Sequence, residues 1–243
     1  MVRPRTTVAI MLPDAVLRYA DHDDAVVDLH LPDGPTDRVV VLIHGGFWKA
    51  EYDRRHTRPM ARALADRGLV VATPEYRRVG KGGGWPVTTD DVRHAVQQLP
   101  ELLGRVGVEP APLVVTGHSA GGHLALWLAT TDLPVQRVVA LAPVCDLGEA
   151  IRLGLGDDAT TAFLGGADPT VADPMVLLAN RPEAEVEIVH GVDDVDVPIS
   201  LSRGLVAAHP WVRLHEVPSA HMELIEPGSS AWPAVVEALT AES

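Results

Sequence analysis

Short, almost uninterrupted apolar runs recur along the chain, and segments with apolar residues at helical spacing separate them. The run at residues 38–43 is the clearest, and its continuous hydrophobicity is typical of a strand buried on both faces. The apolar runs predict strands at residues 16–20, 25–31, 38–43, 69–73, 113–116, 137–141, 186–190 and 212–217. The helical spacing predicts helices at residues 56–67, 89–103, 124–130 and 199–207, and a last helix that starts at Trp232.

The order of these elements predicts an α/β architecture. The first two strands form a hairpin that turns at residues 22–24, and strands then alternate with helices. This order is typical of a mostly parallel sheet with helices on both faces. Residues 143–182 have the least regular pattern, and we expect them to form a small excursion over the site within one domain that spans residues 1–243.

A sharp turn between a strand and a helix carries the first candidate for chemistry. The strand at residues 113–116 leads directly into a Gly-x-Ser-x-Gly motif at residues 117–121, and a helix-forming run follows. A serine at the apex of such a turn exposes its hydroxyl, and the two glycines permit the strained backbone. The same five letters also occur in ordinary glycine-rich turns. The strand before and the helix after favour Ser119 as a nucleophile.

A serine hydroxyl is a weak nucleophile at neutral pH and needs a base, most often a histidine. In sheets of this type the order along the chain is nucleophile, acid, histidine, each in a loop that follows a strand. Among the eleven histidines, His209 precedes the last predicted strand, His215 lies within it and His221 follows it. We therefore predict His221 as the base, and the alternative is that it is a surface-loop histidine.

The acid that orients this histidine is expected after the strand at residues 186–190. Asp193, Asp194 and Asp196 lie there, and spacing alone leaves all three open. Asp146, after the preceding strand, is a weaker candidate. The cluster lacks the glycine and the terminal glutamate of a calcium loop, so we expect no metal site.

Attack on a carbonyl creates an oxyanion, which needs N–H donors that are already in position. Ala120, directly after Ser119, supplies one donor. The predicted strand at residues 38–43 ends in a His-Gly-Gly-Phe-Trp segment, where Gly45 and Gly46 can turn their N–H groups toward a substrate. We expect these three residues to form an oxyanion hole.

Together these motifs resemble those of α/β-hydrolases of the esterase/lipase superfamily over most of the chain. Residues 44–48 resemble the His-Gly-Gly-x-Trp motif of kynurenine formamidases (arylformamidases) and related small esterases. The hormone-sensitive-lipase branch typically has a third glycine where this chain has Phe47. Residues 117–123, with the sequence Gly-His-Ser-Ala-Gly-Gly-His, fit the formamidase-like branch. The acid-loop pattern Gly-x-x-Asp-x-x-Val-Pro matches residues 191–198 in one register, and this resemblance selects Asp194.

The resemblance implies an α/β-hydrolase fold, with antiparallel strands at the N-terminus of a mostly parallel sheet. It implies a serine hydrolase that uses Ser119, His221 and Asp194 through an acyl-enzyme, without a cofactor or metal. The leading substrate is a formyl anilide such as N-formylkynurenine. The first alternative is a carboxylesterase acting on short acyl esters, and the alternative of another class is a non-catalytic binding protein on this fold. Phe47, Trp48 and Trp85 lie in segments expected at or near the site, so we expect these aromatic side chains to bind substrate; core packing is the alternative for each.

Composition and charge limit the classes of binding partner that we expect. The formal net charge of −13 disfavours nucleic acid and anionic membrane surfaces, and the hydrophobic content of 47% argues against disorder. The single cysteine, Cys145, excludes an internal disulfide framework and favours a reducing, cytoplasmic location. The apolar stretch at residues 8–12 is too short for a signal segment, and no apolar run reaches membrane-spanning length. We expect a small acyl substrate as the partner; the oligomeric state stays open, with a homodimer as one option.

Overall fold

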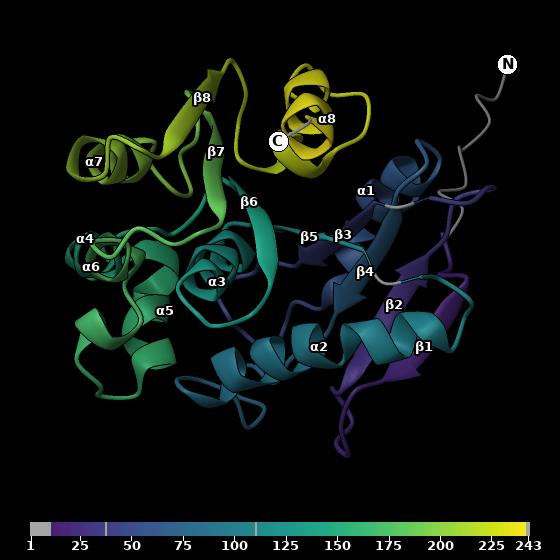
Figure 1. Cartoon of the computed structure of the whole chain (residues 1–243). Helices are drawn as coiled ribbons and strands as arrows, with labels where there is room; N and C mark the ends of the chain where they lie inside the picture. The colour runs from purple at the N-terminus through teal and green to yellow at the C-terminus, as the bar shows by residue number, and fades with distance from the viewer. Residues whose placement is uncertain (1–10, 37, 110, 242–243) are drawn as a thin grey trace, which may run out of the picture.

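A single eight-stranded sheet forms the centre of the molecule in our computed structural model, which describes residues 11–36, 38–109 and 111–241 (Figure 1). The strands lie in the order β1-β2-β4-β3-β5-β6-β7-β8. Their bounds are β1 (Ala15–Arg18), β2 (Val26–His30), β3 (Val39–Ile43), β4 (Val70–Pro74), β5 (Leu113–His118), β6 (Val135–Leu141), β7 (Glu185–Gly191) and β8 (Arg213–Val217).

The pairing of the strands confirms the predicted fold class. β1 pairs with β2 and β2 with β4 in antiparallel fashion, and every later pair is parallel. Parallel neighbours require crossover connections, and helices supply them here. All six parallel strands therefore end at the same edge of the sheet, where ligands bind in open α/β folds.

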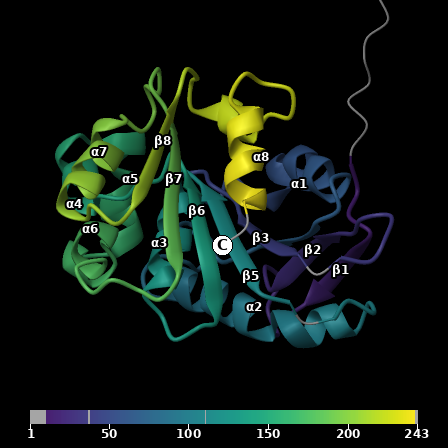
Figure 2. The same ribbon diagram turned by 45° about the horizontal axis from the view of Figure 1, so that its top comes forward.

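Helices cover both faces of the sheet (Figure 2). On one face α1 and α8 pack on a core that includes Met60 and Trp232. On the other face lie α2, α3, α7 and the helices between β6 and β7, around a second core that includes Leu124 and Phe163. The bounds are α1 (Arg58–Ala65), α2 (Val87–Gly104), α3 (Ala120–Ala129), α7 (Ser200–Ala208) and α8 (Trp232–Thr240), and the 3-10 turns η1 (Arg54–Thr57) and η3 (Met222–Ile225).

Strand β3 is fully buried, as its apolar run predicts. Val39, Val41 and Ile43 join the core beneath α2 and α3. Val40 and Leu42 join the core beneath α1 and α8. Because successive side chains of a strand point to opposite faces, one apolar run contributes to both cores.

The segment between β6 and β7 is more regular than its sequence pattern predicts. It contains α4 (Leu147–Arg152), α5 (Leu155–Leu164), η2 (Pro169–Val171) and α6 (Pro174–Leu177). Three aspartates, Asp146, Asp168 and Asp173, cap the starts of α4, η2 and α6 by accepting a hydrogen bond from a backbone N–H. α4, η2 and α6 are too short to show an apolar repeat, and left-handed backbone at Gly156, Asp157 and Asp158 interrupts α5, so periodicity alone could not identify these helices.

Of the apolar stretch at residues 8–12, residues 8–10 lie outside the described residues. Among the helices of the described ranges, none combines the length and the apolar character needed to cross a bilayer.

Candidate active site

Ser119 stands at the turn from β5 to α3 in a backbone conformation that is rare for any residue with a side chain. Its φ is 57° and its ψ is −118°, and its N–H is held by the carbonyl of Leu141 at 2.8 Å. The glycines two positions before and after Ser119 are needed because a Cβ at either one would clash with neighbouring backbone. A Cβ on Gly117 would lie 2.2 Å from the carbonyl oxygen of Gly121, and one on Gly121 would lie 2.2 Å from that of Ile43. The surrounding backbone therefore holds Ser119 in its strained turn.

His221 and Asp194 form a hydrogen-bonded pair at the same edge of the sheet. His221 Nδ1 donates to Asp194 Oδ2 at 2.6 Å, and both side chains are almost fully buried. This donation leaves Nε2 of the imidazole free to accept a proton. Asp194 follows β7, and His221 lies between β8 and η3.

Asp194 is anchored on its other oxygen as well. Its Oδ1 accepts the backbone N–H groups of Asp196 at 2.9 Å and Val197 at 2.8 Å. Burial would raise the pKa of Asp194, but the nearby His190 and the hydrogen bond from His221 outweigh it and hold this pKa well below its ordinary value of 3.8. Asp194 is therefore a fixed anion opposite the imidazole.

His118, the residue before Ser119, supports His221 from beneath. Its Nε2 donates to the backbone carbonyl of His221 at 3.0 Å, and the two rings lie 4.3 Å apart. Burial, and then the neighbouring His221, lower the pKa of His118 well below its ordinary value of 6.5. His118 is thus a neutral imidazole that holds the backbone of His221.

Ser119 and His221 face a common cavity of about 250 Å³. Asp196 reaches the same cavity from the turn after Asp194. The wall is formed mainly by apolar and aromatic atoms. The complete lining is Gly46, Phe47, Tyr52, His56, His118, Ser119, Asp196, His221 and Met222.

The loop after β3 adopts an unusual backbone. Gly46, Phe47 and Trp48 all have positive φ angles, of 104°, 50° and 55°. Gly45 lies against the turn that holds Ser119, since a Cβ there would lie 2.6 Å from the carbonyl oxygen of His118. Within the described ranges, no hydrogen bond uses the N–H of Gly46 or Phe47, and both residues line the cavity. These N–H groups are free to meet an oxyanion.

His44 fixes the start of this loop. Its Nε2 donates to Glu75 Oε1 at 2.8 Å, its ring stacks on Tyr76 at 4.3 Å, and the Tyr76 hydroxyl donates to its carbonyl at 2.8 Å. Glu75 is 2% exposed. Burial would raise the pKa of Glu75, but hydrogen bonding to His44 and the nearby Arg78 lower it to about 2.

The three aromatic residues predicted to bind substrate are placed differently from one another. Phe47 lines the cavity. Trp48 is fully buried, stacked on Phe163 at 4.5 Å. Trp85 is half-buried and meets Trp127 edge-on at 6.1 Å. The structure therefore does not bring Trp48 and Trp85 to this cavity.

Tyr52, His56 and Met222 line the cavity although the sequence does not single them out. Tyr52 and His56 follow the His-Gly-Gly-Phe-Trp segment, and Met222 follows His221. Their closeness to motif residues is the one signal that points to them. His209 and His215 lie elsewhere, bonded to the carbonyl of Met175 and to Glu187.

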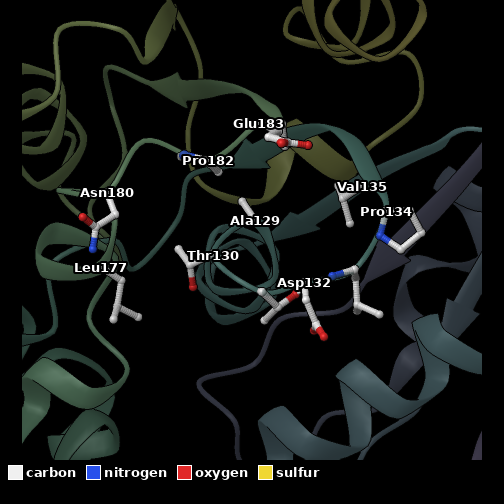
Figure 3. Close-up of a pocket in the computed structure, with 12 residues that line it drawn as sticks. Ala129, Thr130, Asp132, Pro134, Val135, Leu177, Asn180, Pro182 and Glu183 are labelled. Atoms are coloured by element: carbon white, nitrogen blue, oxygen red, sulfur yellow. Dashed lines mark hydrogen bonds between the residues drawn. The ribbon is translucent and has the colours of Figure 1, made fainter.

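A larger hollow of about 610 Å³ lies at the opposite edge of the sheet (Figure 3). It is lined by the end of α3, the start of β6 and the segment before β7, including Thr130, Asp132, Asn180 and Glu183. Ser119 precedes α3 at its other end, so this hollow is separate from the cavity that holds His221.

The fold and the Gly-x-Ser-x-Gly turn that holds Ser119 are those of an α/β-hydrolase. Esterase B of Lactobacillus rhamnosis superimposes with a TM-score of 0.76 and 20% identity, covering 93% of this chain and 83% of that one. The chain belongs to the BD-FAE family, whose model matches residues 27–208.

Two proteins similar in sequence to this chain are described as hydrolases of different substrate classes. The probable carboxylic ester hydrolase LipM of Mycobacterium tuberculosis is 31% identical over 195 residues, which are 70% of this chain and 44% of LipM. A kynurenine formamidase of Salmo salar is 28% identical over 116 residues, which are 47% of this chain and 37% of that enzyme. The chain thus spans less than half the length of either relative.

Proposed function

We propose that the protein is a serine hydrolase that cleaves small carboxylic esters through an acyl-enzyme. The carrying observation is the 2.6 Å hydrogen bond from His221 to Asp194 beside a cavity that His221 shares with Ser119. A histidine fixed in this tautomer presents Nε2 as a base, and a serine on a strained turn presents its hydroxyl. The similarity to LipM supports ester hydrolysis.

In the first half-reaction, Ser119 Oγ attacks the ester carbonyl carbon while His221 Nε2 takes the hydroxyl proton. Asp194 stabilises the imidazolium that forms. The tetrahedral oxyanion is met by the N–H groups of Ala120 and Gly46, with Phe47 beside them. The intermediate then collapses, the carbon–oxygen bond to the leaving group breaks, and His221 donates its proton to the departing alkoxide.

In the second half-reaction, water replaces the alcohol. His221 takes a proton from this water, and the resulting attack on the acyl-enzyme forms a second oxyanion in the same place. Collapse expels Ser119 Oγ, which recovers its proton from His221, and the carboxylic acid leaves. Each proton that enters the imidazole is therefore returned within the same half-reaction.

The size and walls of the cavity favour a short acyl or alkyl group. About 250 Å³ is at or below the lower end of ordinary ligand pockets. Phe47, Tyr52 and Met222 supply apolar surface beside Ser119. We therefore assign short-chain esters as the substrate class.

Arylformamidase activity is the second candidate, and two observations favour it. The chain is similar to a kynurenine formamidase, and Phe47 and Tyr52 offer aromatic surface for an aryl leaving group. The same acyl-enzyme chemistry would release formate from a formyl anilide. Esters rank first because LipM matches a larger share of this chain than the formamidase does.

Two measurements test this assignment. A fluorophosphonate probe should label the wild type and not Ser119→Ala, while Ser200→Ala, on an exposed serine, should label normally. The kcat/KM for p-nitrophenyl butyrate should exceed that for N-formylkynurenine. Labelling that persists in Ser119→Ala would reject the nucleophile. Turnover of N-formylkynurenine without ester turnover would place arylformamidase activity first. Absence of both activities would favour the alternative of a non-catalytic binding protein.

A further inference from the structure

One acidic side chain that lines the catalytic cavity, Asp196, has no charged partner among the residues that the structure describes. Asp196 lines the cavity, and only its backbone N–H is engaged, by Asp194. Within the ranges 11–36, 38–109 and 111–241, its carboxylate makes no hydrogen bond and no ion pair. Asp194, two residues earlier, has both oxygens occupied. Asp196 therefore presents an uncompensated negative charge to any bound substrate.

Two histidines that line the cavity do not offset this charge. His56 donates from Nδ1 to the carbonyl of Asp53 at 2.6 Å, which leaves Nε2 as an acceptor. Desolvation and the neighbouring His44 lower the pKa of His56, and the pKa of His118 is also lowered. Both imidazoles are therefore neutral at pH 7. No lysine or arginine of the described part of the chain lines this cavity.

We infer that Asp196 is a specificity-determining residue that makes the cavity favour esters carrying a positive charge over esters carrying a negative one. This inference rests on the proposed function, because it concerns substrates cleaved at Ser119. A cationic group near Asp196 is attracted, and a carboxylate in the same place is repelled. His56 Nε2 adds a neutral acceptor that suits an ammonium and not a carboxylate.

Coulomb's law gives the size of the effect. For unit charges about 7 Å apart at an effective dielectric constant of about 40, the interaction changes a rate or binding constant about five- to tenfold. The cationic and anionic esters are affected in opposite directions. The ratio of their kcat/KM values therefore changes by the square of this factor, about 25- to 100-fold, when the charge is removed.

Three aryl acetates that differ only at the para position test the inference: one with methyl, one with trimethylammoniomethyl and one with carboxymethyl. The kcat/KM for each is measured with the wild type, Asp196→Asn and Asp193→Asn. Asp193 is the matched control, because it is exposed on the same turn, loses the same charge and does not line the cavity. The cation-to-anion ratio within one variant cancels differences in the fraction of active enzyme, and its change between variants cancels intrinsic reactivity.

The expected result is a fall of at least about tenfold in the cation-to-anion ratio for Asp196→Asn, and of less than about twofold for Asp193→Asn. Added salt should reduce the wild-type ratio, because Asp196 is exposed and its field is screened. Equal ratios in the two variants would overturn the inference while leaving the proposed function intact. Failure of the wild type to cleave any of the three acetates, or cleavage that survives Ser119→Ala, would overturn the proposed function and this inference with it.

Discussion

His118 Nε2 donates a hydrogen bond to the backbone carbonyl of His221 at 3.0 Å. The residue before the candidate nucleophile thus holds the residue proposed as its base, although 103 positions separate them in the chain. This bond ties the turn after β5 to the segment after β8.

Replacing His118 should loosen this link. His118→Leu leaves the carbonyl of His221 without its donor, which costs about 1–3 kcal/mol. We expect kcat to fall about 10- to 100-fold with p-nitrophenyl butyrate, and KM to change little. His118→Gln, which keeps an N–H donor, should lose less activity. Equal loss in both variants, with matching loss of thermal stability, would assign His118 a packing role only.

Asp194 and Asp196 can be separated by their effect on catalysis. Asp194→Asn removes the acceptor that fixes the tautomer of His221, so kcat should fall by about 10⁴. Asp196→Asn should lower kcat for a neutral ester far less, because the carboxylate that is hydrogen-bonded to His221 is that of Asp194. Steady-state kinetics of the two variants, with circular dichroism to verify folding, provide the measurement. A large loss in Asp196→Asn with a mild one in Asp194→Asn would reverse the assignment of the acid.

Glu75 makes the free energy of unfolding depend on pH. Its pKa is about 2 in the folded protein and 4.5 ordinarily, so the folded state binds fewer protons at this group. Its stabilising contribution is present above pH 4.5 and is lost as the pH falls toward 2. Urea unfolding between pH 7 and pH 3 should show this loss, and Asp194 adds to it in the same direction.

Glu75→Gln provides the comparison. The variant should be about 1–3 kcal/mol less stable at pH 7, because Arg54 and Arg78 each lose one buried anionic partner but keep Asp28 and Asp24. Its free energy of unfolding should also fall less steeply between pH 4.5 and pH 3. Parallel pH dependences in variant and wild type would show that Glu75 is not the group responsible.

Phe47 and Trp48 are neighbours with opposite expected roles. Phe47→Ala widens the cavity, so it should shift the preference among p-nitrophenyl acetate, butyrate and hexanoate toward longer chains at little cost in stability. Trp48→Ala leaves a hole against Phe163 and should cost about 3–5 kcal/mol of unfolding free energy. A changed chain-length profile in Trp48→Phe, which retains the packing, would instead place Trp48 in contact with substrate.

The strands and the mostly parallel character of the sheet could be predicted because apolar runs and their spacing reflect burial directly. β3 is the clearest case, since its continuous run corresponds to a strand with a core on either side. The helices α4 and α6 could not be predicted from periodicity, because they are too short to repeat a pattern. Their aspartate caps are visible in the sequence, and they could have marked the helix starts.

The candidate site likewise contains residues that could be predicted from the sequence and residues that could not. The motif around Ser119 and the order of the chain suffice to propose His221, and a family pattern was needed to choose Asp194 among three aspartates. The sequence does not show in which direction a side chain points. Phe47 and Trp48 are adjacent aromatic residues in one motif, yet Phe47 lines the cavity and Trp48 is buried in the core. Tyr52 and His56 lie in no recognisable pattern at all.

The order of the strands has a consequence for how activity develops during folding. The turn that holds Ser119 follows β5 in the middle of the sheet, whereas His221 follows β8 at its edge, the last strand to be made and the last in the row. Contacts between residues so distant in sequence close slowly. Recovery of hydrolysis after dilution from denaturant should therefore lag behind recovery of secondary structure. The rate at which activity returns would then report the rate at which β8 joins the sheet.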